Sequence, residues 1–393
     1  MSPHQHTPSQ NPPLAGLKVL ELGAVLAIPS VGMFLAELGA DVVKVEPPQG
    51  DMTRTWQVHD EPVQNGLSAY YASVNWGKRL IVLNAKEEAD WAVLDRLIAQ
   101  ADVMLVNFKP GSAQRLGLDA ESMLAKHPRL IYASVTGYGP QDSRAGFDAV
   151  IQAESGVMYL NRNPGELPMK MPVAMMDILA GHQLKQAILL ALLQREQTGK
   201  GQEVQTSLMQ AGVAALANQG SSYLYHGINP SPLGSEHPSI YPYGGSFRTR
   251  DDKFLVLAIG NDRQFRELCA VLAHPEWADD SRFAHNPQRV DHREALRPLL
   301  TEAILQLNRD SFLKDLAERG VPAAAVYDVQ EAFEQPAVAP LIMQGEEGDA
   351  HAAVRGLRTV AFHSSAWQPQ ANMDSPQPKD SHRTAVLRDW LGE

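Results

Sequence analysis

A single aspartate, Asp177, stands where an apolar run meets a helical pattern in VAMMDILAGHQLKQAILLALLQREQTGKG, residues 173–201. Burying a carboxylate there is costly unless hydrogen bonds or charges compensate. Two roles would explain it. As a helix N-cap, the carboxylate would accept backbone N–H bonds. As a nucleophile, it would be kept ionised by the same N–H groups and activated by the loss of water. Local spacing alone favours the cap.

Basic and aromatic residues gather near expected strand ends, where open α/β sheets bind ligands. They lie in NWGKRL, just before a strand, and in NFKPGSAQRLG, just after one. In an acidic protein such a cluster suits a phosphate-bearing nucleotide, with cations for the phosphates and a phenyl ring for the adenine. The alternative is a solvated surface group. The residues are Lys78, Arg79, Asn107, Phe108, Lys109 and Arg115.

The sequence lacks the common nucleotide and hydrolase motifs. The first expected strand–helix turn, LELGAVLAIPSVG, has no G-x-G-x-x-G, and Ala27, Ile28 and Pro29 stand where a pyrophosphate loop needs bare backbone. A Walker A loop, H-E-x-x-H, G-x-S-x-G and a paired C-x-x-C are also missing from the sequence. These features argue against a classical NAD or FAD site.

The amino-acid composition limits the classes of molecule that the protein is expected to bind. A net charge of −11 over 393 residues disfavours nucleic acid and anionic membranes. No apolar run reaches the roughly 18 residues that a membrane span needs. The single cysteine, Cys269, sits among apolar residues at helical spacing, so we expect it in the core and the protein in the reducing cytoplasm.

Alternating strand and helix patterns must position these residues. LKVLEL, SVGMFLAELGA and DVVKVE form one βαβ unit, and the theme recurs, which predicts a doubly wound, Rossmann-like α/β domain followed by a smaller α+β domain. The helix 182–195 is apolar on opposite sides, which predicts burial by the domain or by a partner chain. The expected organisation is a disordered tail 1–13, a large domain 14–220, a linker 221–235, a small domain 236–330, and a return segment 331–393 whose C-terminal helix packs on the large domain.

Nine stretches in order resemble the family III CoA-transferases, the group that includes formyl-CoA transferase and the carnitine CoA-transferases. The likeness covers about residues 14–390. The stretches are LAGLKVLEL, LAELGADVVKVE, NWGKRLIVLN, VNFKPGSAQRLG, SVTGYG, AGFDAVIQAESG, MMDILAG, LLQREQTGKGQ and GVPAAAVYDVQE.

The resemblance implies a fold in which each chain makes an open ring and two chains interlock as a homodimer. It also makes Asp177 the catalytic nucleophile. The implied CoA contacts are Lys78 and Arg79 near the phosphates, Asn107 with Phe108 beside the nucleotide, Arg115, and Val25 with Leu26 at the thioester. We further expect backbone donors for developing oxyanions at Gly137, Gly244 and Gly245, and substrate contacts from Tyr138 and Phe147.

The implied activity is acyl-CoA transfer. CoA would move from an acyl-CoA donor to a small carboxylic acid, such as the dicarboxylates succinate or oxalate, through an aspartyl mixed anhydride and an aspartyl-CoA thioester. CoA and acyl-CoA are then substrates, and no permanently bound cofactor or metal is expected.

Departures from the family pattern limit the substrate assignment. Leu26 replaces the glutamine of formyl-CoA transferase, and YPYGGSF offers two glycines where that enzyme has four. The racemase branch reads G-H-D where this chain has Gly146–Asp148, and Phe147 cannot shuttle a proton. An acyl-CoA racemase or epimerase and a non-catalytic CoA-binding paralogue stay open as alternatives.

Overall fold

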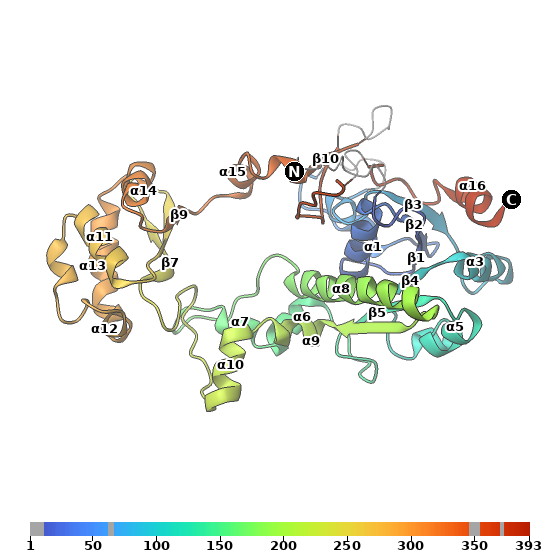
Figure 1. The fold of residues 1–393 in the computed structure, drawn as a ribbon, viewed down its shortest axis with the longest axis horizontal. Coiled ribbons are helices and arrows are strands. Elements are labelled where there is room, and N and C mark those ends of the chain that lie inside the picture. Colours follow the sequence, from blue (N-terminus) through green and yellow to red (C-terminus); the bar gives the residue numbers. More distant parts are fainter. Residues whose placement is uncertain (1–11, 62–66, 346–353, 370–372) are drawn as a thin grey trace, which may run out of the picture. The chain divides into compact units, whose positions relative to one another are not determined.

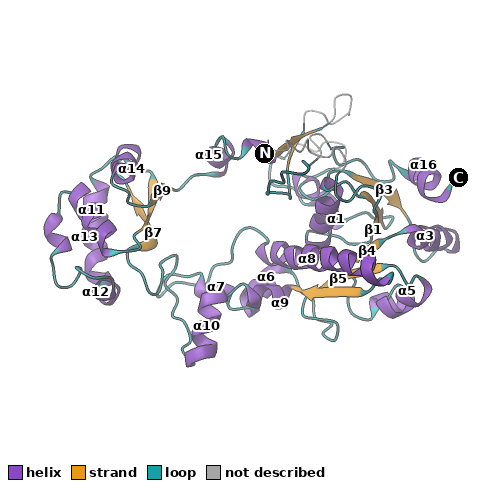
Figure 2. Cartoon of the chain, viewed as in Figure 1, coloured by secondary structure: helices purple, strands orange, loops and turns teal. Residues whose placement is uncertain are grey.

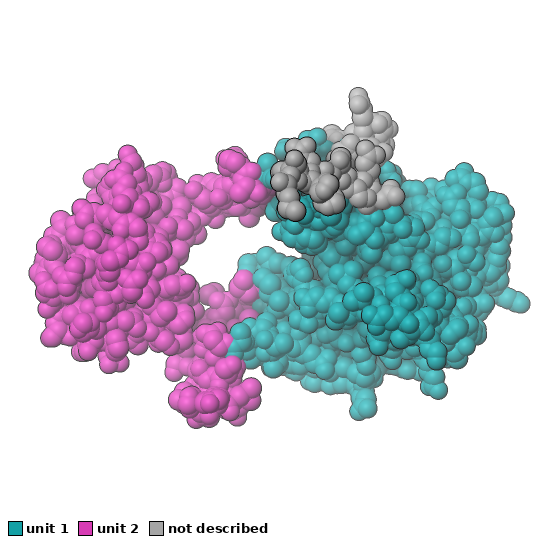
Figure 3. Space-filling model, in the orientation of Figure 1, with its two compact units in different colours: residues 1–155, 172–217, 339–393 teal, residues 156–171, 218–338 magenta. Residues whose placement is uncertain are grey.

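The computed structural model describes residues 12–61, 67–345, 354–369 and 373–393. The predicted disordered tail therefore lies almost wholly outside the described residues. The chain divides into two compact units (Figure 3): unit 1 comprises residues 1–155, 172–217 and 339–393, and unit 2 comprises residues 156–171 and 218–338. The domain boundaries expected from the sequence stay a prediction.

Unit 1 is built on a parallel sheet that, in the described residues, has six strands in the order β3-β2-β1-β4-β5-β6. This is the doubly wound order of a Rossmann-like fold, so the predicted α/β class is confirmed for this unit. The strands are β1 (Lys18–Glu21), β2 (Asp41–Glu46), β3 (Lys78–Val82), β4 (Val103–Val106), β5 (Ile131–Thr136) and β6 (Glu203–Ser207).

Helices and short turns complete unit 1 (Figure 1). They are α1 (Ala27–Glu37), η1 (Met52–Thr55), α2 (Ala69–Ala72), α3 (Glu88–Gln100), α4 (Ser112–Leu116), α5 (Ala120–Lys126), α6 (Asp148–Glu154), α8 (Met175–Thr198), α9 (Leu208–Ala214), η3 (Ala339–Leu341), α16 (Arg383–Val386) and η4 (Leu387–Leu391). A two-stranded antiparallel ribbon joins β10 (Ile342–Gln344) to β11 (Arg355–Leu357).

Apolar side chains pack against the parallel sheet where its strands β1, β2 and β4 are buried. On one face Val386 and Trp390 of the C-terminal helical segment share a core with Leu94 and Leu97 of α3. On another side α8 packs closely on α1, since a Cβ built on Gly181 would lie 2.7 Å from Ser30 Oγ. Burial on both faces explains why the central strands of the sheet are rich in apolar residues, whereas the edge strand β6, EVQTS, is polar and partly exposed.

Unit 2 combines a small antiparallel sheet with helices (Figure 2). Its strands are β7 (Tyr243–Arg248), β8 (Phe254–Ala258) and β9 (Ala323–Ala325), and the β7–β8 hairpin turns through the Asp251–Asp252 region. Its helices and short turns are α7 (Val157–Leu160), α10 (Ala217–His226), α11 (Asp262–Val271), η2 (Pro275–Ala278), α12 (Asn286–Asp291), α13 (Arg293–Leu305), α14 (Arg309–Glu318) and α15 (Val329–Phe333). Cys269 lies in this unit's core, as predicted.

The single chain buries α8 only in part, so the predicted cover of its other side by a partner chain stays a prediction. The helix is buried on the side that faces α1, but Leu190 is 66% exposed and Leu193 is 60% exposed. The apolar stripe on its opposite side is therefore not covered by unit 1. None of the helices in the described ranges combines the length and apolarity needed to cross a membrane.

Candidate active site

The loop between β1 and α1 is held in one backbone conformation by buried side chains. Val25 has a φ of 71°, in the left-handed region that residues with a side chain rarely adopt. Its N–H donates to the Asp51 carboxylate at 3.2 Å. Lys44 Nζ donates to the same carboxylate at 3.2 Å and to the carbonyl oxygen of Gly23 at 2.9 Å. Because Lys44 and Asp51 are buried, these bonds are strong and fix the loop.

Asn107, at the end of β4, holds the same loop from the other side. Its Oδ1 accepts the N–H of Ala24 at 3.1 Å, and its Nδ2 donates to the carbonyl oxygen of Ala24 at 2.8 Å. The amide therefore orders the loop backbone, a function that the sequence did not reveal. The predicted contact of Asn107 with a nucleotide gains no support from these bonds.

Asp177 lies in the first turn of α8 but does not cap that helix. The N-cap position belongs to Ala174, and the helix begins at Met175, so Asp177 is its third residue. The predicted N-cap role is wrong for this helix. Instead, the carboxylate accepts the backbone N–H of Ala27, the first residue of α1. It thus satisfies a free donor at the N-terminus of a different helix.

Burial raises the pKa of Asp177 to about 7, and the negative charge of Asp148 adds to this shift, whereas the N–H of Ala27 opposes it. We expected helix N–H groups to keep the carboxylate ionised, but burial outweighs them. Near neutral pH the protonated and ionised forms are both populated. A carboxylate with a raised pKa is more basic, which favours attack on an electrophilic carbon.

Tyr70 lines neither of the cavities described below, but it is close enough to Asp177 to sense its charge, although no spacing in the sequence points to it. Burial raises the pKa of its phenol to about 12, and the charges of Asp177, Asp148 and Asp51 add to the effect. The phenol therefore stays protonated and can donate a hydrogen bond. Its ring packs edge-on against Trp56, with the two ring centroids 5.1 Å apart. In the sequence, Tyr70 cannot be told apart from an aromatic residue of the hydrophobic core.

A cavity of about 170 Å³ opens beside Asp177 and is called here the Asp177 pocket. It brings together six further residues expected at the site, which are Val25, Asn107, Phe108, Lys109, Gly137 and Phe147. Leu26 and Tyr138 adjoin it but do not line it. The full lining is Ala24, Val25, Ala27, Asn107, Phe108, Lys109, Pro110, Val135, Thr136, Gly137, Arg144, Ala145, Gly146, Phe147, Asp148, Asp177 and Leu208.

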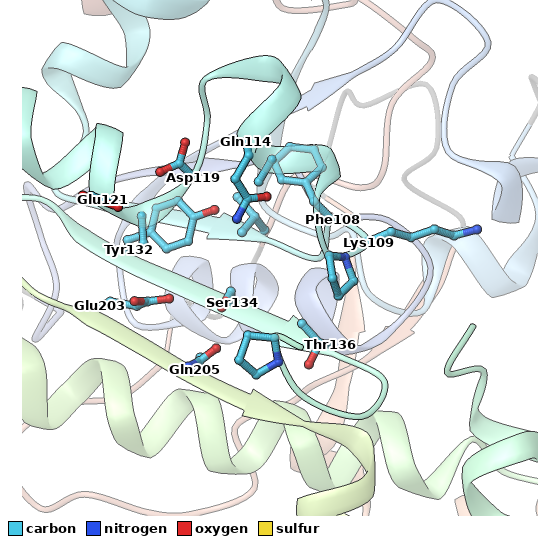
Figure 4. A pocket seen from close by; sticks show the side chains of 15 residues that line it. Phe108, Lys109, Gln114, Asp119, Glu121, Tyr132, Ser134, Thr136, Glu203 and Gln205 are labelled. Atoms are coloured by element: carbon cyan, nitrogen blue, oxygen red, sulfur yellow. The ribbon is translucent and has the colours of Figure 1, made fainter. Parts of the chain in front are cut away.

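A second cavity, of about 270 Å³, adjoins the first and is called here the strand pocket (Figure 4). Phe108, Lys109, Pro110 and Thr136 line both cavities, so the two form one extended surface. Polar residues of β5 and β6 form its floor, and α4 and α5 its opposite wall. The remaining lining is Val106, Ala113, Gln114, Asp119, Ala120, Glu121, Tyr132, Ser134, Pro140, Glu203 and Gln205.

The two cationic side chains at these cavities differ in whether a carboxylate of the protein already pairs with them. Lys109 is exposed and makes no ion pair within the described ranges of the chain, and its side chain extends away from the strand pocket's floor (Figure 4). Arg144, in contrast, pairs with Asp142 at 2.9 Å and with Glu154 at 3.1 Å. Its guanidinium also stacks on Tyr138, 3.8 Å from the ring centroid. Lys109 is therefore better placed to bind an anionic ligand.

Lys78, expected near phosphates, is instead fully buried at the start of β3. Its Nζ lies 2.8 Å from Glu21 Oε2 and donates to the carbonyl oxygen of Pro29 at 2.8 Å and to Asn75 Oδ1 at 3.0 Å. Burial lowers its pKa to about 8. These contacts leave no donor facing either cavity, so the structure gives no support to the predicted phosphate contact.

The other two predicted phosphate ligands also lie outside both cavities. Arg79 pairs with Asp41 and, at 2.9 Å, with Asp389 near the C-terminus. Arg115 lies on α4, where its guanidinium donates to Ser112 Oγ at 2.8 Å. We expected both cations to lie near the ligand, but Arg79 pairs with two carboxylates and Arg115 donates to a hydroxyl group of its own helix.

The predicted oxyanion donors fall in different units. Gly137 lines the Asp177 pocket, whereas Gly244 and Gly245 lie on β7 of unit 2. A Cβ on Gly244 would lie 2.1 Å from the carbonyl oxygen of Ser235, and one on Gly245 would lie 3.0 Å from Arg297 Nη1. These two glycines therefore allow close packing within unit 2.

Gly137 and Gly146 bring two loops of the pocket wall into direct backbone contact. A Cβ built on Gly137 would lie 2.5 Å from Gly146 Cα, and one built on Gly146 would lie 2.1 Å from Gly137 Cα. Neither backbone segment can shift at a low cost in energy, so only glycine fits at both positions. The contact fixes the 144–148 segment against the end of β5.

Replacing Gly146 with Ala is expected to destabilise the protein by about 1–3 kcal/mol, because the new methyl group overlaps backbone atoms. Urea unfolding measures the effect. Gly260→Ala is the control, since its nearest contact would be an ordinary 3.5 Å to Gln264 Oε1, and it should change stability by less than about 0.5 kcal/mol. Equal stabilities of the two variants would contradict the close contact.

No group of three or more histidine, cysteine, aspartate or glutamate side chains in the described part of the chain is arranged to hold a metal ion.

Comparisons with known proteins agree with these features. The family model for CoA-transferase family III matches residues 14–382. The chain is 38% identical over 389 residues to the succinate–glutarate CoA-transferase of Agrobacterium fabrum, covering 97% of this chain and 96% of that one. It is 34% identical over 388 residues to the human succinyl-CoA:glutarate CoA-transferase, covering 96% and 86%. A crystal structure of a CAIB/BAIF family protein from Brucella suis is 40% identical, with a TM-score of 0.86 over 97% of this chain and 100% of that one.

Proposed function

Because the chain belongs to CoA-transferase family III, we propose that it transfers CoA from a dicarboxylic acyl-CoA such as succinyl-CoA to a second small dicarboxylic acid. Relatives named for succinate or succinyl-CoA and glutarate support this substrate class. Another relative, from Chloroflexus aurantiacus, is named a succinyl-CoA–D-citramalate CoA-transferase. The observation that carries the proposal is the half-buried Asp177, held by the N-terminus of α1 beside a cavity and with a pKa near 7.

The proposed reaction passes through three covalent states of Asp177: a mixed anhydride with the donor acid, an aspartyl-CoA thioester and a mixed anhydride with the acceptor acid. An oxygen of its carboxylate attacks the acyl carbonyl of the donor, the C–S bond breaks, and CoA leaves as the thiolate, which gives a mixed anhydride. The thiolate then attacks the carbonyl carbon of Asp177 and expels the donor acid, which gives an aspartyl-CoA thioester. The acceptor carboxylate attacks this thioester and releases the thiolate, which finally attacks the acceptor's acyl carbon and regenerates the Asp177 carboxylate.

Three features of the site suit these steps. Partial burial leaves the Asp177 carboxylate poorly solvated and basic, which strengthens its attack on the thioester. Gly137 lines the Asp177 pocket, and we propose that its backbone donates to developing oxyanions, with the neutral phenol of Tyr70, which senses the charge of Asp177, as a second candidate donor. The side chain of Phe147 carries no titratable group, which favours transfer over racemisation.

The CoA moiety is proposed to follow the surface shared by the two cavities. Phe108 offers a face for stacking the adenine, and Lys109 offers a charge for the phosphates. The acidic residues Asp119, Glu121 and Glu203 on the strand pocket would repel phosphate, which leaves the Lys109 side of this surface as the phosphate path.

Lys109→Ala is expected to raise KM for acyl-CoA about tenfold with kcat changed less than about threefold, because a phosphate contact supports binding rather than the reacting centre. The effect should shrink as salt is added. Lys86→Ala removes another exposed lysine and serves as the control. An unchanged KM, or a loss confined to kcat, would argue against the proposed phosphate path.

The proposed function is tested by incubating the purified protein with succinyl-CoA and a panel of mono- and dicarboxylic acids, followed by chromatography of the acyl-CoA products. We expect new acyl-CoA species with dicarboxylates and none without an acceptor. Hydroxylamine added during turnover should trap the activated carboxyl of Asp177 as a hydroxamate, located by mass spectrometry. A protein that binds CoA but forms neither product nor hydroxamate would be a non-catalytic paralogue, and deuterium wash-in at the α-carbon would instead indicate a racemase.

We also propose that two chains, each an open ring, interlock as a homodimer in the cytoplasm. The uncovered leucines of α8 support a partner, as does α10, on which Leu224 and Tyr225 are each 85% exposed. Surfaces of this kind commonly mark subunit contacts.

A further inference from the structure

Asp148 holds the first turn of α8, the turn that carries Asp177. It is the first residue of α6, and its Oδ1 accepts the backbone N–H of Met176 at 2.8 Å. Its Oδ2 accepts Gln152 Nε2 at 2.7 Å, which fixes the orientation of the carboxylate. The N-cap residue of α8, Ala174, has no side-chain acceptor, so Asp148 satisfies from another helix a donor that would otherwise stay unpaired.

Met176 is the neighbour of Asp177, so this hydrogen bond acts one residue away from the proposed nucleophile. If the bond is lost, the first turn of α8 is free to fray, and the Asp177 carboxylate moves relative to Ala27 and the cavity. A shift of about 1 Å in a reacting group can cost on the order of a hundredfold in rate.

Asp148 also places a negative charge beside Asp177, and this charge raises the pKa of Asp177 together with burial. The other ionisable groups around Asp177 act differently. The phenol of Tyr70, from α2, stays neutral up to a pH of about 12. Lys109 and Arg144 line the same cavity, but Arg144 is already paired with Asp142 and Glu154. Asp148 is thus the nearby carboxylate that tunes the proposed nucleophile.

We propose that Asp148 is a positioning residue for Asp177, which caps the helix that carries the nucleophile and supplies the negative charge next to it. This inference rests on the proposed function, and it adds an electrostatic and a geometric role that the reaction scheme does not itself require.

Two substitutions separate the two roles. Asp148→Asn keeps an oxygen that can accept the N–H of Met176 but removes the charge, so the acid limb of kcat/KM against pH should move to lower pH by roughly one unit. Asp148→Ala removes both, and we expect kcat to fall about a hundredfold with little change in KM for acyl-CoA. A cap with no electrostatic role would leave the pH profile of Asp148→Asn unchanged.

Asp328→Ala is the matched control, because Asp328 caps α15 through a 2.8 Å bond from the N–H of Glu331 and lies in unit 2. It should leave both kcat and the pH profile as in the unmodified protein. A pH profile of Asp148→Asn that superimposes on the unmodified one, together with an unchanged kcat for Asp148→Ala, would overturn the proposal.

A readout independent of turnover separates this inference from the proposed function. Infrared difference spectra of the unmodified protein and Asp177→Asn should reveal the protonated carboxyl band of Asp177, titrating near pH 7. In Asp148→Asn this band should titrate at lower pH, whether or not any acid pair supports transfer. An inactive unmodified protein would refute the proposed function, whereas an unshifted band would refute the electrostatic role of Asp148.

Discussion

Asp177→Asn is expected to reduce CoA transfer by on the order of 10³-fold or more, because the amide cannot form the anhydride or the thioester. The asparagine oxygen can still accept the N–H of Ala27, so the fold and the binding of acyl-CoA should change little. Exchange of isotopically labelled acid into acyl-CoA measures the loss most directly, since it requires only the first half of the reaction.

The matched control for this experiment is Asp291→Asn, an equally small change at an exposed position of α12. It should retain full exchange. Asp177→Glu keeps a carboxylate but extends it by one methylene group, so we expect partial loss. Exchange retained by Asp177→Asn would remove Asp177 from the mechanism, and loss in Asp291→Asn as well would point to a general defect.

The same Asp177→Asn change is expected to stabilise the protein at alkaline pH. The pKa of Asp177 rises from 3.8 to about 7 on folding, with burial as the main cause. Between these values the native state binds more protons than the unfolded state, so the stability of the unmodified protein falls as pH rises through this window. Because asparagine cannot ionise, the Asp177→Asn variant does not lose stability in this way.

The free energy of unfolding of Asp177→Asn, relative to that of the unmodified protein, is expected to increase by about 2–3 kcal/mol between pH 5 and pH 8. Each unit of pKa difference corresponds to about 1.4 kcal/mol. Partial contact of the side chain with water reduces this increase. Urea unfolding at the two pH values measures the difference, and Asp291→Asn should show none. If Asp177→Asn and the unmodified protein differed in stability by the same amount at both pH values, ionisation of Asp177 would not destabilise the folded protein.

If ionisation of the proposed nucleophile destabilises the folded protein, the site favours reactivity over stability. The fixed loop at Val25, the glycine contact at Gly146 and the cap from Asp148 all hold the surroundings of Asp177 in place. Together these contacts allow the Asp177 carboxylate to ionise, at a cost in stability, without a change in the structure around it.

Several features followed from the sequence alone. Apolar runs alternating with amphipathic patterns determine the parallel strands, because a strand covered on both faces must be apolar throughout. The ordered motifs identified the family, and the aspartate before an apolar helix identified the candidate nucleophile. These features are local or recur in order along the chain, so they can be read without knowing which segments meet.

The tertiary structure decided the partners of polar side chains. Lys78 and Asn107 look like ligand-binding residues in the sequence, yet one joins a buried ion network with Glu21 and the other holds Ala24. The role of Asp148 depends on its meeting α8, 28 positions further along the chain. The pKa of Asp177 likewise depends on burial and on that neighbour. Charge, hydrogen bonding and desolvation act over a few ångströms in space, and only the folded chain fixes those distances.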